Sequence, residues 1–137
     1  MDDFRHLIDL DQLTSAGTLT LARAAAEAIR GLNWTTSTHA GLDQPSVAYD
    51  LAASLSLAAS RLPQLLTQIT RYLGSALAAG QLGHDLGEDP AHDIRAAAVS
   101  LHHARLSAAA LATSLNQAQQ QLARINGTPA RSRPQHT

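Results

Sequence analysis

The sequence contains no cysteine and no lysine, and only four of its 137 residues are Phe, Trp or Tyr. The absence of cysteine excludes disulfide scaffolds, thiolate zinc sites and cysteine nucleophiles. No run of about 18 apolar residues is present, and the acidic start has no apolar segment typical of an export signal. From these absences we expect a cytoplasmic protein that does not enter the membrane.

Alanine and leucine dominate the composition, with 27 and 22 residues, whereas β-branched and aromatic residues are few. This composition favours helices and argues against a β-sheet protein. The length predicts one domain, residues 1–127. The segment 128–137 has no apolar residue larger than alanine, so we expect a disordered tail.

A first helix is predicted over residues 11–31, with Asp11 as its cap and Gly31 at its end. A polar loop, residues 33–41, should follow, and its Trp34 is expected to anchor in a gap of the core. We expect this helix to cover one side of the two longer helices.

A second helix is predicted from Asp43, as cap, to Gly80, with Pro45 in its first turn. Its apolar residues follow three- and four-residue steps over about five heptads. The row consists of Ala48, Leu51, Leu55, Ala58, Leu62, Leu65, Ile69, Tyr72, Ala76 and Ala79. Because the spacing is unbroken at Pro63, we expect one long helix, although a break there would give two. A second apolar row runs beside it, through Ala52, Ala59, Leu66 and Leu73.

A third helix is predicted from Asp89-Pro90 to Gly127, with a second regular apolar row. This row consists of Ile94, Ala97, Leu101, Ala104, Ala108, Leu111, Leu115, Ala118, Leu122 and Ile125. Two matched rows joined by a short loop predict an elongated antiparallel hairpin. With the first helix it would form an all-α three-helix bundle, or a four-helix bundle if Pro63 breaks the second helix.

Apolar residues that fall outside these rows predict an interaction surface. Val99 and Leu106 lie one heptad apart and should form an exposed stripe, while Leu66 and Leu73 add a second contact. Burial of these residues would need a partner protein or a second copy of the chain.

The densest polar cluster, residues 84–93, predicts either helix capping or a divalent-metal site. It consists of His84, Asp85, Glu88, Asp89, His92 and Asp93. No second helix offers a matching Glu-x-x-His, as di-metal bundles require. Acids at a helix start also complement its dipole, so capping is the better-supported interpretation, and we expect neither a metal nor a cofactor.

Arg95 and His102, separated by six residues, resemble the loosest form of the motif in HEPN-fold ribonucleases. The resemblance covers two residues, and Ala96 stands where those nucleases favour a polar residue. It implies catalytic roles in RNA cleavage for Arg95 and His102. The basic residues Arg124, Arg131 and Arg133 offer a further alternative, weak contact with nucleic-acid phosphates.

A longer resemblance rests on Arg-Leu-Pro-Gln-Leu-Leu at 61–66, Tyr72-Leu73 and Gly87-Glu88-Asp89-Pro90. Over residues 43–126 the chain is similar to a group of small, uncharacterised, Ala/Leu-rich helical proteins of actinobacteria. The resemblance implies source and fold, and no activity. A weaker similarity is to the helical hairpins of type VII secretion, whose Trp-x-Gly turn is missing here.

The sequence therefore predicts a non-enzymatic helical interaction or adaptor module, dimeric or bound to a partner protein. The alternatives are a HEPN-like ribonuclease and a nucleic-acid accessory protein.

Overall fold

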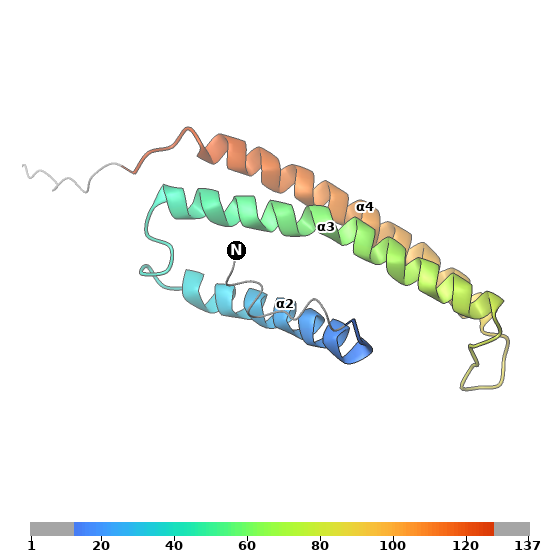
Figure 1. Cartoon of the computed structure of the whole chain (residues 1–137). Coiled ribbons are helices and arrows are strands. Elements are labelled where there is room, and N and C mark those ends of the chain that lie inside the picture. The colour runs from blue at the N-terminus through green and yellow to red at the C-terminus, as the bar shows by residue number, and fades with distance from the viewer. Residues whose placement is uncertain (1–12, 128–137) are drawn as a thin grey trace, which may run out of the picture. The chain divides into compact units, whose positions relative to one another are not determined.

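The computed structural model describes residues 13–127, and this part holds three α-helices and no strand (Figure 1). They are α2 (Ser15–Thr36), α3 (Pro45–Ala78) and α4 (Ala91–Leu122). The all-α fold is confirmed. In the described part, no helix combines the length and apolar character needed to cross a bilayer.

The chain divides into two units, residues 1–43 and 44–137, which are described separately. The expectation that the first helix covers the hairpin therefore stays a prediction. The predicted cap Asp11 and the tail 128–137 lie outside the described residues.

Helix α2 begins and ends later than the sequence predicts. Thr14 caps it, because its Oγ1 accepts from the Gly17 amide at 3.0 Å. The helix passes Gly31, and the hydroxyls of Thr35 and Thr36 donate to the Leu32 carbonyl near its end. These hydroxyls therefore satisfy carbonyls at the helix end instead of breaking the helix. Trp34 is 76% exposed, so it is not anchored within its own unit, and its predicted role in a core shared with the hairpin stays a prediction.

Helix α3 runs as a single element through Pro63, as its unbroken spacing predicts. Pro45 is its first residue, but the predicted cap Asp43 is wrong, since Gln44 holds the cap position without a side-chain bond. At the other end Gly80 has φ 71°, and the Gln81 amide donates to the Ala76 carbonyl at 2.9 Å. This geometry is the Schellman motif, which ends the helix where the glycine predicts.

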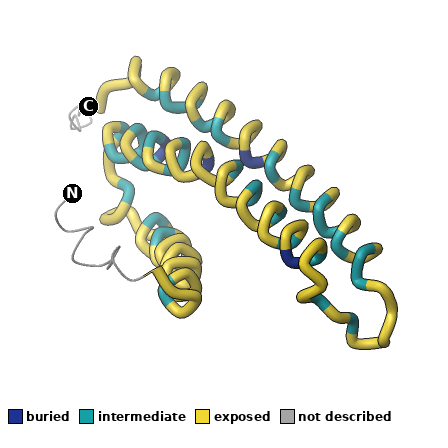
Figure 2. The backbone as a smooth tube through the Cα atoms, turned by 45° about the vertical axis from the view of Figure 1, so that its right-hand side comes forward, coloured by how far each residue is buried: buried dark blue, intermediate teal, exposed yellow. Residues whose placement is uncertain are grey.

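Helices α3 and α4 form the expected antiparallel hairpin and lie side by side (Figures 1 and 2). Three hydrogen bonds join them, because Gln119 donates to the Tyr49 hydroxyl, Ser56 to the Ala112 carbonyl and Arg105 to Thr67. The sequence numbers rise along one helix as they fall along the other, which fixes the antiparallel direction.

The buried residues of the described part are all alanines, and they lie in the hairpin (Figure 2). They are Ala52, Ala59, Ala76 and Ala108. Small residues at the facing positions allow two helices to approach closely. The hairpin therefore closes on small side chains and leaves many larger apolar ones outside.

The row of α3 that faces α4, which we call the inner seam, differs by one position from the prediction. It contains the buried or half-buried residues Ala52, Ser56, Ala59, Pro63, Leu66, Thr70 and Leu73. On α4 the inner seam is Ile94, Ala98, Leu101, Arg105, Ala108, Ala112, Leu115, Gln119 and Leu122. Three members of the row predicted on α4, Ala104, Leu111 and Ile125, are exposed.

The phase error arises because polar residues occupy the inner seam. Ser56, Arg105 and Gln119 bond across the hairpin, so they are accommodated where an apolar pattern would not place them. The predicted row on α3, which is richer in leucine, consequently lies beside the inner seam.

Candidate functional site

A heptad-spaced apolar row on α3 remains outside the inner seam, and we call it the outer row. It consists of Leu55, Ala58, Leu62, Leu65, Ile69 and Tyr72. Leu55 is half-buried, whereas Leu65 is 49% and Tyr72 62% exposed. No member is charged, and the steps of three and four are those of a helix-packing face.

The outer row extends onto the neighbouring helix. Leu62 and Ile69 directly precede inner-seam residues of α3, and Ala104 and Leu111 directly precede inner-seam residues of α4. In an antiparallel helix pair such positions lie on the same flank, so Leu111, 51% exposed, widens the apolar surface. Large apolar surfaces of this kind mark interaction sites.

The predicted interface residues fall into two sets. Val99 and Leu106 are 56% and 55% exposed and lie off the inner seam, as the sequence predicts for a stripe. Leu66 and Leu73 are half-buried, and each lines a groove between α3 and α4. These two leucines therefore contribute to the hairpin itself.

His102, a residue of the predicted ribonuclease pair, contacts Arg105 and not Arg95. Its Nδ1 lies 2.8 Å from a terminal nitrogen of Arg105, and both residues line a groove between the helices. Arg95 is exposed and does not line that groove. Arg105 was missed by sequence reasoning, although a charged residue between Leu101 and Ala108 was a signal that could have revealed it.

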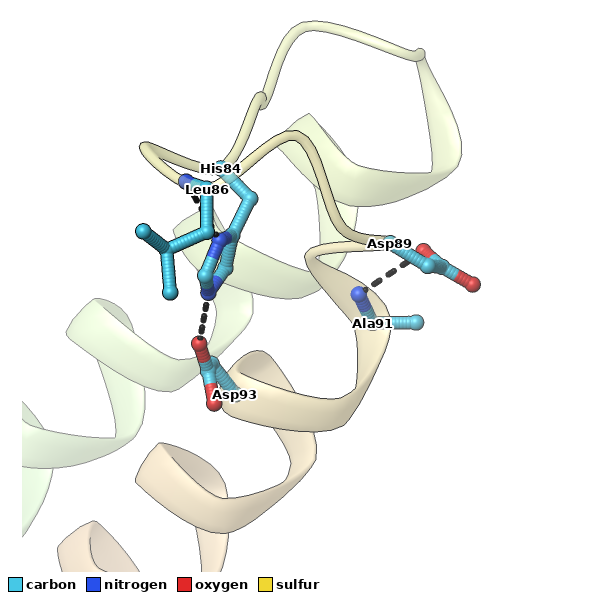
Figure 3. Close-up of polar contacts among 5 residues, drawn as sticks. All are labelled: His84, Leu86, Asp89, Ala91 and Asp93. Carbon is cyan, nitrogen blue, oxygen red and sulfur yellow. Dashed lines mark hydrogen bonds and ion pairs between the residues drawn. The ribbon is translucent and has the colours of Figure 1, made fainter.

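The polar cluster at residues 84–93 forms a clamp on the hairpin loop (Figure 3). The Leu86 amide donates to His84 Nδ1 at 3.1 Å, so the ring hydrogen lies on Nε2, 2.6 Å from an Asp93 oxygen. Asp89 accepts from the Ala91 amide at 3.0 Å. Asp89 thus satisfies an amide at the start of α4, although Pro90 holds the cap position.

The clamp leaves His84 without a nitrogen for a metal, because both ring nitrogens are already bonded. Across residues 13–127, no three His, Asp or Glu side chains come together as metal ligands do. Asp85, Glu88 and His92 are exposed. The clamp fixes the loop and the first turn of α4.

Of the three predicted phosphate-contacting residues, Arg124 lies within the described part of the chain. Arg124 is exposed just beyond the end of α4, and its amide donates to the Gln121 carbonyl at 3.3 Å. Arg131 and Arg133 lie outside the described residues.

No protein-family model, curated protein or solved structure matches this sequence. The resemblance to the actinobacterial group therefore stays a prediction from its motifs.

Proposed function

We propose that the protein is a non-enzymatic helical interaction module that pairs with a second copy of itself through the outer row of α3. The observation that carries this proposal is the uncharged, heptad-spaced apolar row beside the inner seam, whose large residues from Leu62 to Tyr72 are exposed. Such a row is the face that another helix of the same spacing covers.

The outer row is complementary to itself when two copies meet antiparallel. With the two-fold axis between Pro63 and Gln64, Leu62 meets Leu65 of the second copy, and Ala58 meets Ile69. Leu55 meets Tyr72 in the next layer. A small residue thus faces a branched one, and each contact occurs twice, as an isologous interface requires.

Charge also favours a second copy. The outer row contains no charged residue, so two copies meet without like-charge repulsion. Full burial of an exposed Leu or Ile side chain contributes roughly 1.5–3 kcal/mol, and about half of that where the side chain is already half-buried. Several such residues on each copy are enough to offset the association cost of about 4–15 kcal/mol.

Light scattering behind size exclusion tests the proposal with two matched variants. Leu65 and Leu57 are both on α3 and are 49% and 51% exposed, but Leu57 is not in the outer row. We expect the parent and Leu57→Glu to run at twice the 14.4 kDa chain mass, and Leu65→Glu to run at the single mass. A helical circular-dichroism spectrum of each variant checks that it folds.

Three results would overturn the proposal. One is a parent protein that is monomeric at every concentration tested, which would mean that a second copy does not cover the outer row. Another is equal dissociation by Leu57→Glu and Leu65→Glu. The third is a Leu106→Glu variant that is monomeric while the Leu65→Glu variant remains a dimer. This result would assign the interface to the stripe of Val99 and Leu106.

A further inference from the structure

A groove between α3 and α4 is lined by polar and positively charged side chains together with apolar ones. Its volume is about 370 Å³. Thr67, Arg71, His102 and Arg105 line it together with apolar residues such as Leu101. Arg71 and His102 are exposed, whereas Arg105 and Thr67 are half-buried. This volume lies within the range typical of small-molecule sites.

Arg105 is held in place within this groove. One terminal nitrogen donates to Thr67 Oγ1 at 3.1 Å, and that hydroxyl donates to the Pro63 carbonyl at 2.9 Å. The other terminal nitrogen lies 2.8 Å from His102 Nδ1. Because arginine can only donate, His102 accepts at Nδ1 and keeps a hydrogen on Nε2. Arg105 therefore retains three N–H groups, and His102 retains one, for a further acceptor.

The positive charge of the groove is not balanced by nearby acids. The sequence has no Asp or Glu between Asp50 and Asp85, and none after Asp93. In residues 13–127, the ion pairs join Glu27 to Arg30 and His84 to Asp93. Neither pair involves Arg71 or Arg105, so an anion entering the groove meets both guanidinium groups without competition.

We propose that this groove binds the phosphate group of a small phosphomonoester. Arginine presents donors in a planar fork that matches phosphate oxygens. Arg105 supplies a pre-positioned guanidinium and Arg71 a second charge, while Leu66 and Leu101 offer an apolar wall for a compact organic body.

The lining also favours a compact phosphate over a nucleotide or nucleic acid. No Phe, Trp or Tyr lines the groove, whereas base recognition relies on stacking against aromatic rings. Thr67 and His102 directly follow inner-seam residues, so the groove lies on the opposite flank from the outer row. Phosphate binding and self-association can therefore occur together.

Isothermal titration calorimetry at low salt, with glycerol 3-phosphate and inorganic phosphate as probes, tests this site. Arg71 and Arg61 provide matched variants, since both are exposed on α3 and only Arg71 lines the groove. We expect saturable binding by the parent, a loss of affinity of about tenfold or more in Arg71→Gln, and no change in Arg61→Gln. Arg105→Gln should weaken binding at least as much.

The absence of saturable binding by either probe overturns the proposal, as does an equal loss in Arg61→Gln, which would indicate diffuse charge. Binding of a single-stranded RNA that glycerol 3-phosphate cannot displace also overturns it, in favour of nucleic acid. Arg71-dependent binding to phosphatidic-acid vesicles, with no binding of the free probes, likewise overturns it, since the ligand would then be a lipid headgroup and not a small phosphomonoester.

Discussion

His84 shows how a residue that suggests metal chemistry can serve a structural role. Its ring joins the hairpin loop to α4, accepting from the Leu86 amide and donating to Asp93. The imidazole side chain is 18% exposed, so these bonds are partly shielded from water. The sequence alone reveals the residue types of this cluster, but not which atoms pair, because loop geometry decides that.

His84→Ala should lower stability, because it removes both bonds of the clamp. The expected cost is about 1–2 kcal/mol, which lowers Tm by several degrees. Thermal melts followed by circular dichroism at a fixed protein concentration measure it. His92 is the control, since it lies in the same cluster and is exposed. Equal losses in His84→Ala and His92→Ala would contradict the role given to the clamp.

The ends of α3 could be predicted better than the face it presents, whereas α4 ends at Leu122 and not at the predicted Gly127. Pro45 and Gly80 mark the ends of α3 by local chemistry, which needs no knowledge of the rest of the fold. The face toward α4 depends on cross-helix bonds made by residues such as Arg105 and Gln119. Apolar spacing carries no information about those bonds, so it favoured the outer row.

The sequence likewise predicted part of one candidate site and missed the other. Leu62 and Leu65 of the outer row were recognised as parts of a packing face, but the face was assigned to the wrong neighbour. The groove around Arg105 was not recognised, because its residues come from two helices and meet only in the hairpin. Two of its lining residues are named by the sequence analysis for other roles, His102 as the partner of Arg95 and Leu66 as an interface residue.

Pro63 should reduce the stability of α3, because it has no N–H to donate to the Ala59 carbonyl. We therefore expect Pro63→Ala to stabilise the protein by about 1–3 kcal/mol and to raise Tm by several degrees. Pro45→Ala is the matched control in the same helix, since Pro45 occupies the first position, where no such bond is lost. A lower Tm for Pro63→Ala would mean that packing of the Pro63 ring outweighs the missing hydrogen bond.

At the scale of the hairpin unit, charge and apolar surface are separated. The acids of this unit other than Asp50 lie in the loop and the first turn of α4, at residues 85–93. The outer row is uncharged, and the groove on the opposite flank carries Arg71 and Arg105. The two proposed contacts therefore depend on different forces.

The two proposed contacts should differ in how strongly their affinities depend on salt concentration. Raising NaCl from about 50 mM to about 500 mM shortens the screening length severalfold. We expect the dimer dissociation constant, measured by sedimentation equilibrium, to change less than about threefold, because its interface is apolar. Phosphate affinity should fall about tenfold or more over the same range. A dimer that dissociates at high salt would point to a charged interface instead.

Alanine at the buried positions gives the hairpin an uneven tolerance of mutation. Any replacement at Ala59 or Ala108 other than glycine adds atoms where two helices meet, and overpacking there is costly. Exchanges among Leu, Ile and Met on the outer row leave that contact unchanged. Over evolutionary time the buried alanine positions are therefore expected to stay small, while the outer row diversifies and with it the choice of partner, without any change of fold.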